Sequence, residues 1–133
     1  MAILGGGGIK VAEVTIATGA VLTLNGTPVE VVPAPGVGRA NIPLMITASV
    51  AFVSAAYATN TSLTVGYGGA GIVTITGILN ATSSKVATAA GTVPAVAIAT
   101  AQNAAINVSV ATGNPITGDS PITVSVAYMT VTL

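Results

Sequence analysis

The content of β-branched residues constrains this chain more than any other feature: 19 Val, 12 Ile and 19 Thr make up 50 of its 133 residues. Two heavy atoms on Cβ stiffen the χ1 torsion, and such side chains pack well on a pleated sheet. A chain of this length holds one domain with a hydrophobic core and is too short for two ordinary ones. The sequence therefore predicts a single all-β domain.

Charged residues are few and balanced, with three Lys/Arg against three Asp/Glu, or 5% of the chain. Histidine, cysteine and tryptophan do not occur, which removes the commonest general base, the commonest zinc ligands, thiol nucleophiles and disulfides. The three acids, Glu13, Glu30 and Asp119, fall in separate predicted elements, so each is interpreted as an isolated surface charge. We predict no enzyme activity and no catalytic, cofactor or metal site. We also predict no nucleic-acid partner, because the chain has no basic patch to attract phosphates.

The predicted surface lacks the net charge that usually keeps a small soluble protein dispersed. Its polar positions carry mainly Thr, Ser and Asn, which are neutral and can be buried against another protein at a low desolvation cost. The composition therefore indicates a component of an assembly, and we expect a homo-oligomer or a partner-bound state.

The chain is apolar enough, with a mean hydropathy of +0.90, for a membrane helix to be considered. The strongest segment spans residues 40–58, where the even positions carry Ile42, Leu44, Ile46, Val50 and Phe52, and Asn41, Thr47 and Ser49 fall on odd positions. A period of two is that of a half-buried strand, so no membrane partner is predicted. The N-terminus has no basic segment before its short apolar stretch, so we expect cytoplasmic synthesis without cleavage of a signal peptide.

Turns rich in glycine and proline divide the chain into about eight short strands, expected at residues 11–18, 28–32, 41–53, 61–67, 72–76, 92–100, 106–110 and 122–133. Two segments are ambiguous: residues 20–24 form a short strand or one helical turn, and residues 92–105 form a strand or a short helix. Residues 77–91 are expected to be irregular. Short strands at this spacing are typical of sandwiches and barrels, so residues 11–133 are predicted to form a jelly-roll-like β-sandwich.

Residues 1–10 are expected to form a flexible N-terminal arm, because four consecutive glycines do not hold a fixed backbone without outside contacts. Small apolar side chains flank these glycines and are candidates for contacts with a neighbouring subunit. Arg39 lies between a Pro/Gly corner and the longest apolar strand, where it is either a solvated edge charge or a bidentate contact to a partner. The candidate interface residues are Ile3, Leu4, Ile9, Arg39, Tyr67 and Tyr128.

Two stretches of the sequence support a resemblance to a known family. The first forty residues contain VTI at 14–16, VLTLN at 21–25, TPV at 27–29 and VPAPGVGR at 32–39, and the chain ends in ITVSVAYMTVTL at 122–133. These stretches resemble small structural proteins of tailed bacteriophages, which share such an opening run and a long C-terminal strand with a central tyrosine. The middle of the chain is similar only in composition, and Ala127 and Met129 stand where that family usually has charged residues beside the tyrosine.

The resemblance implies a capsid cement or decoration protein, bound to the outer surface of a phage head through the major capsid protein and copies of itself. It also implies a virion location, synthesis in the host cytoplasm and no active site. A head-fibre base or a tail structural protein would share these sequence features. A bacterial surface adhesin or pilus-like subunit has a similar composition but is expected to carry an export signal.

Overall fold

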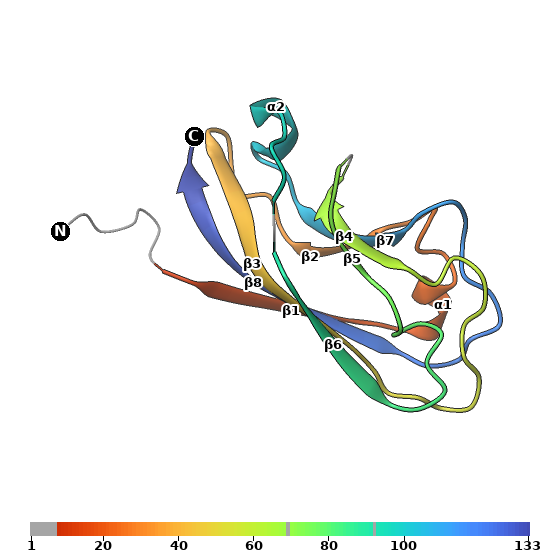
Figure 1. The fold of residues 1–133 in the computed structure, drawn as a ribbon. Helices are drawn as coiled ribbons and strands as arrows, with labels where there is room; N and C mark the ends of the chain where they lie inside the picture. Colours follow the sequence, from red (N-terminus) through yellow and green to blue (C-terminus); the bar gives the residue numbers. More distant parts are fainter. Residues whose placement is uncertain (1–7, 69, 92) are drawn as a thin grey trace.

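The computed structural model describes residues 8–68, 70–91 and 93–133, which fold into two four-stranded sheets packed face to face (Figure 1). Sheet A has the strand order β1–β8–β3–β6, formed by Lys10–Ile16, Ile122–Thr132, Arg39–Val50 and Lys85–Ala90. Sheet B has the order β2–β7–β4–β5, formed by Val29–Val32, Ile106–Val110, Leu63–Tyr67 and Ala70–Ile75. Neighbouring strands in the described residues are antiparallel, so the predicted all-β sandwich is confirmed.

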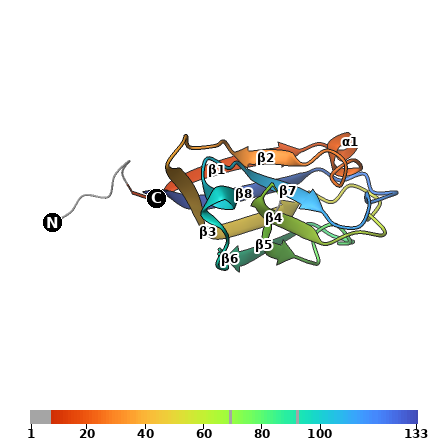
Figure 2. The same cartoon turned by 90° about the horizontal axis from the view of Figure 1, so that it is seen from above.

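The strand pairing is nested: β1 pairs with β8, β2 with β7, β3 with β6 and β4 with β5. Two further pairings, β3 with β8 and β4 with β7, join these pairs in the centre of each sheet. This order is that of a jelly roll, in which eight strands form two sheets around one core. Figure 2 shows the two layers from above, with α1 (Thr18–Val21) at the end of the sandwich opposite the C-terminus.

The core lies between the sheets and follows the alternation of side chains along each strand. In β4, β7 and β8 the inward residues are buried: Leu63, Val65, Tyr67, Ile106, Val108, Val110, Ile122, Val124 and Val126. Burying one Val, Leu or Ile side chain contributes about 1.5–3 kcal/mol. A slip of one residue would expose a whole inward row, so the alternation of Val and Ile also fixes the register of the sheets.

Strand β3 departs from the face predicted for residues 41–53. Leu44 is 37% exposed and Asn41 only 2% exposed, the reverse of the prediction, whereas Ile46 is buried as expected. The cause is a shift of register against β8 between Pro43 and Met45: a bulge there moves the later residues to the other face, at a proline that has no N–H for the ladder. The strand also ends before Phe52, at Val50.

The structure overturns one prediction for residues 77–105 and decides between the two alternatives of another. Residues 85–90 are not irregular but form β6, which pairs with the second half of β3. Their alanines and threonine give little contrast between faces, so the strand arises from pairing with β3 and not from a local pattern. For residues 92–105 the helical alternative agrees with α2 (Ile98–Ala101), and the strand expected at residues 92–100 is wrong, since the described residues before α2 have no regular structure.

The two helices that the structure describes are single turns. For residues 20–24 the helical alternative agrees with α1, although this helix begins at Thr18. Within the described ranges, no helix is long enough to cross a membrane.

Candidate interaction surfaces

Two of the candidate interface residues, Arg39 and Tyr128, line one cleft of about 170 Å³, together with Lys10. Lys10 begins β1 directly opposite Tyr128 of β8, and Arg39 begins β3 opposite Thr132, near the end of β8. We call this concavity the basic cleft; its other lining residues are Pro33, Ala34, Pro35, Asn41 and Thr130. It lies at the end of the sandwich where β3 starts and the C-terminus lies (Figure 1).

The wall of the basic cleft is held by Asn41, which the sequence analysis did not single out. This side chain is buried, its Nδ2 donates to the carbonyl oxygen of Pro33 at 3.0 Å, and its Oδ1 accepts from the hydroxyl of Thr130 at 2.7 Å. Asn41 thus ties the corner after β2 to the last strand. The available signal was a polar amide between two apolar residues, Ala40 and Ile42, in a strand expected to face the core.

Tyr67, another candidate interface residue, lies in the core with 2% of its surface exposed. Its hydroxyl reaches across from sheet B and donates to the carbonyl oxygen of Asn41 at 2.5 Å, on a part of β3 beside which β6 does not extend. Burial raises the pKa of this hydroxyl. The Tyr67 side chain therefore links the two sheets and leaves almost no surface for a partner.

The backbone around Arg39 is fixed by hydrogen bonds to two other segments of the chain. The N–H of Asn103 donates to the carbonyl oxygen of Arg39 at 2.8 Å, and the Asn103 Oδ1 accepts from the N–H of Gly36 at 2.9 Å. The N–H of Leu133 donates to the carbonyl oxygen of Gly38 at 2.9 Å. Because both glycines have positive φ, 110° and 78°, this corner needs residues without a side chain. Arg39 thus projects from a rigid base.

The remaining candidates differ in what the structure describes. Ile9 is exposed immediately before β1 and is not among the residues that line the basic cleft. Ile3 and Leu4 lie outside the described residues, as does most of the arm predicted for residues 1–10. Glu30, the acid closest to Arg39 in the sequence, lies on β2 in sheet B and is exposed.

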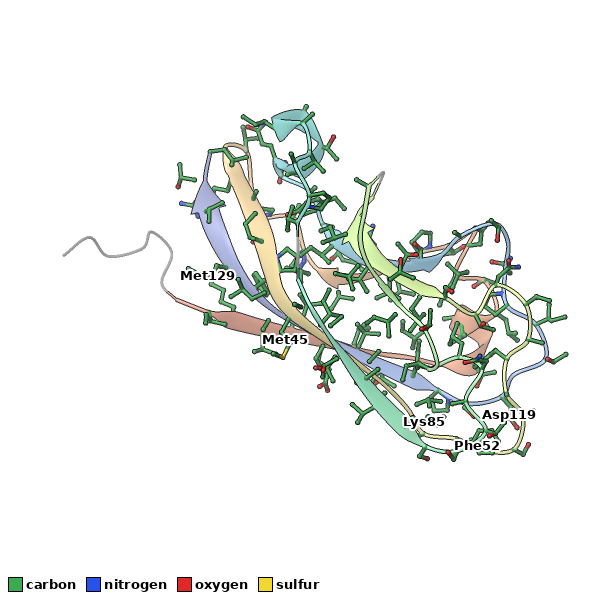
Figure 3. The ribbon with its side chains drawn as sticks, in the orientation of Figure 1. Met45, Phe52, Lys85, Asp119 and Met129 are labelled. Atoms are coloured by element: carbon green, nitrogen blue, oxygen red, sulfur yellow. The ribbon has the colours of Figure 1, made fainter. Side chains whose placement is uncertain are left out.

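The outer face of sheet A, turned away from sheet B, is a second candidate surface. Val11, Met45 and Val86 are exposed there, and Figure 3 shows Met45 and Met129 on this side of the sheet. On this face β1 carries one charged residue, Glu13, whose carboxylate accepts a hydrogen bond from the Ser125 hydroxyl at 2.8 Å. Exposed aliphatic and thioether groups on a sheet with little charge are suited to burial against another protein.

A second, polar cleft of about 180 Å³ lies on the outer side of sheet B, over Gly66 and Gly71. Asn107 lines it, and its Oδ1 is buried without a hydrogen-bond partner in the described part of the chain. A Cβ on Gly66 would lie 2.2 Å from the carbonyl oxygen of Ala70, so the glycine permits the close approach of β4 and β5. Among the residues that the structure describes, no group of His, Cys, Asp or Glu is placed to hold a metal ion.

Asp119, at the other end of the sandwich (Figure 3), is a surface carboxylate whose hydrogen bonds join two loops. Its Oδ1 accepts from the N–H groups of Ser54 and Ala55 at 3.1 and 2.9 Å, and its Oδ2 accepts from the Ser54 hydroxyl. These bonds, the Ser54 hydroxyl first, lower the pKa of Asp119 to about 2. Asp119 therefore joins the loop after β3 to the loop before β8, across a separation in sequence that no local pattern reveals.

Acidification is expected to weaken the fold through Asp119. The unfolded chain takes up a proton on this carboxyl near its usual pKa of 3.8, and the folded chain only near pH 2. The stabilisation is therefore present above the unfolded pKa and is lost as the pH falls toward the folded one. Urea unfolding at about pH 5 and about pH 2.5 measures this loss.

The Asp119→Asn variant is expected to be less stable than the parent protein near neutral pH and to lose less stability on acidification. Glu13→Gln is the matched control, because it removes one acid with a single hydroxyl partner on an exposed face. Equal pH dependence in Asp119→Asn and in the parent protein would contradict this role.

The comparisons with known proteins concern the fold. No protein-family model matches the sequence, and no curated protein matches it. Among solved structures, the chain is similar to a chain of the cyanophage Pam1 capsid asymmetric unit, with a TM-score of 0.55 and 23% sequence identity. This similarity covers 96% of the present chain and 91% of that chain. The two chains therefore share a fold along nearly their whole length.

Proposed function

We propose that this protein is a non-enzymatic structural component of a tailed-phage virion, a cement or decoration protein that binds the outer surface of the head. The observation that carries the proposal is the jelly-roll fold shared, over nearly the whole chain, with a chain of the Pam1 capsid asymmetric unit. The sequence resemblance to small phage structural proteins at residues 14–39 and 122–133 points to the same class independently of the strand order.

The proposed partners are the major capsid protein and further copies of this chain. Large apolar side chains exposed on the isolated domain favour association, and they include Val11, Met45 and Val86 on the outer face of sheet A. A chain with six charged residues offers few ion pairs, so the attachment rests mainly on apolar burial and backbone hydrogen bonds. A monodisperse monomer in dilute solution, by light scattering, would count against the oligomeric part of the proposal.

The decisive experiment is quantitative mass spectrometry of purified virions. Hundreds of copies per particle are expected for a protein of the head surface. A few copies would assign the chain to a tail, a vertex or the base of a head fibre. Absence from washed particles would overturn the virion role altogether.

Attachment to the particle is expected to survive high salt. Raising the ionic strength from about 0.05 to about 1 M shortens the Debye length to about 3 Å and screens exposed charge pairs, but it does not weaken apolar burial. Sedimentation of particles at both salt concentrations should leave most of the protein with the particles. Release of most copies at about 1 M would contradict an apolar attachment.

A further inference from the structure

The cations of this chain are unevenly distributed. Lys10 and Arg39, two of its three Lys and Arg residues, line the basic cleft, and the third, Lys85, lies at the other end of the sandwich near Phe52 and Asp119 (Figure 3). None of the three acids is among the residues that line the cleft; they are Glu13, Glu30 and Asp119. A chain of zero net charge thus has one concave site that is locally positive.

We propose that the basic cleft binds the carboxylate of an Asp or Glu side chain carried on an extended segment of the virion protein to which this chain attaches. The inference rests on the proposed function for the identity of the partner. The recognition chemistry itself depends only on the residues of the cleft.

The spacing of the strands places the two cations on either side of the site. Lys10 stands on β1 and Arg39 on β3, with β8 between them and Tyr128 and Thr130 on its cleft side. Strands lie about 4.8 Å apart and rise about 3.3 Å per residue, so the Cα atoms of Lys10 and Arg39 are separated by roughly 16 Å. A carboxylate that enters between their extended side chains meets positive charge from both sides.

The cleft is organised before any partner binds. Asn41 fixes its wall through Pro33 and Thr130, and hydrogen bonds from Asn103 and Leu133 hold the backbone on which Arg39 stands. A rigid site spends less conformational entropy on binding than a mobile one. The guanidinium supplies two parallel N–H donors that match a carboxylate. Tyr128, whose side chain carries a hydroxyl donor, lines the same cleft.

The surroundings of the cleft favour a peptide over other anions. Its lining includes the apolar residues Pro33, Ala34 and Pro35, and such groups are suited to the neighbouring side chains of a peptide. Nucleic acid draws most of its affinity from many phosphate contacts, and two cations supply few. The volume of about 170 Å³ matches a side chain and not a folded element.

The first test is a nuclear magnetic resonance titration of the full chain with two blocked tripeptides, acetyl-Val-Glu-Val-amide and acetyl-Val-Gln-Val-amide. The glutamate peptide is expected to shift the Arg39 side-chain N–H and the amides of Lys10 and Tyr128, and the glutamine peptide to leave them in place. Arg39→Ala should abolish the shifts, and Lys85→Ala should retain them. Equal responses to both peptides, or stronger binding of inorganic phosphate at the same residues, would overturn the proposal.

The second test uses particles that lack the protein, on which variants compete with the parent chain. A charge-assisted hydrogen bond contributes about 1.5–3 kcal/mol, which corresponds to a tenfold or greater change in affinity. Arg39→Glu should therefore lose at least tenfold in occupancy, while Lys85→Glu, the matched reversal outside the cleft, competes equally. Equal occupancy of Arg39→Glu and the parent chain would overturn the proposal, whereas failure of the parent chain to bind any particle would instead contradict the virion role.

Discussion

Replacing Gly118 with alanine is expected to destabilise the fold by about 3 kcal/mol. A Cβ at this position would lie 2.2 Å from the Cγ and Cδ1 atoms of Tyr57. The tyrosine cannot withdraw easily, because its hydroxyl donates to the carbonyl oxygen of Ser120 at 2.7 Å and its N–H to that of Leu79 at 3.0 Å. Urea unfolding monitored by circular dichroism measures the loss.

The matched control is Gly26→Ala, because a Cβ on Gly26 would meet no atom within 4 Å. This variant is expected to keep its stability within about 0.5 kcal/mol. A second control relieves the clash: in a Tyr57→Leu background, Gly118→Ala should cost much less than in the parent chain, since the ring atoms are gone. If the losses of unfolding free energy for the two substitutions are strictly additive, the Tyr57 ring is not the reason why position 118 requires glycine.

The sequence predicts most of the fold because, in most strands, the residues that favour an extended backbone are also the residues that the core buries. Val and Ile at every second position in residues 106–110 and 122–126 give an inward row that has only one buried register. The jelly-roll class likewise follows from the number and spacing of such segments. Strand β6 was not predicted, because alanine occurs on both of its faces and gives no alternation of apolar and polar residues. Residues 85–90 are extended because they pair with the edge of β3.

The candidate surfaces depend on topology more than the strands do. Arg39 was singled out from its position after a Pro/Gly corner, but its proximity to Lys10 requires β8, the last strand, to lie between the first and the third. Asp119 likewise gains its partners from a loop more than sixty residues earlier. Tyr67 was predicted at an interface but lies in the core. The sequence does not distinguish a tyrosine whose hydroxyl contacts a partner from one whose hydroxyl donates to a carbonyl oxygen of the same chain, as that of Tyr67 does.

Replacing Asn41 with alanine is expected to destabilise the protein by about 2–4 kcal/mol. The substitution leaves the carbonyl oxygen of Pro33 without its donor and the hydroxyl of Thr130 without its acceptor, and it opens a void beside a residue that is 2% exposed. Pro33 is exposed and Thr130 half-buried, so the loss combines the net contributions of two hydrogen bonds, about 0.5–1.5 kcal/mol each, with the cost of the void. Urea unfolding of the variant measures it.

Asn107→Ala provides the matched comparison, because Asn107 also lies on a strand but its Oδ1 has no hydrogen-bond partner in the described part of the chain. Removing an amide whose acceptor is already unpaired is expected to change stability by no more than about 1 kcal/mol. The two variants should also differ locally: hydrogen exchange at the Asn103 amide, which donates to Arg39, should accelerate in Asn41→Ala and stay unchanged in Asn107→Ala. Equal losses of stability in both variants would mean that the amide of Asn41 contributes only packing, and the wall of the basic cleft would then need another explanation.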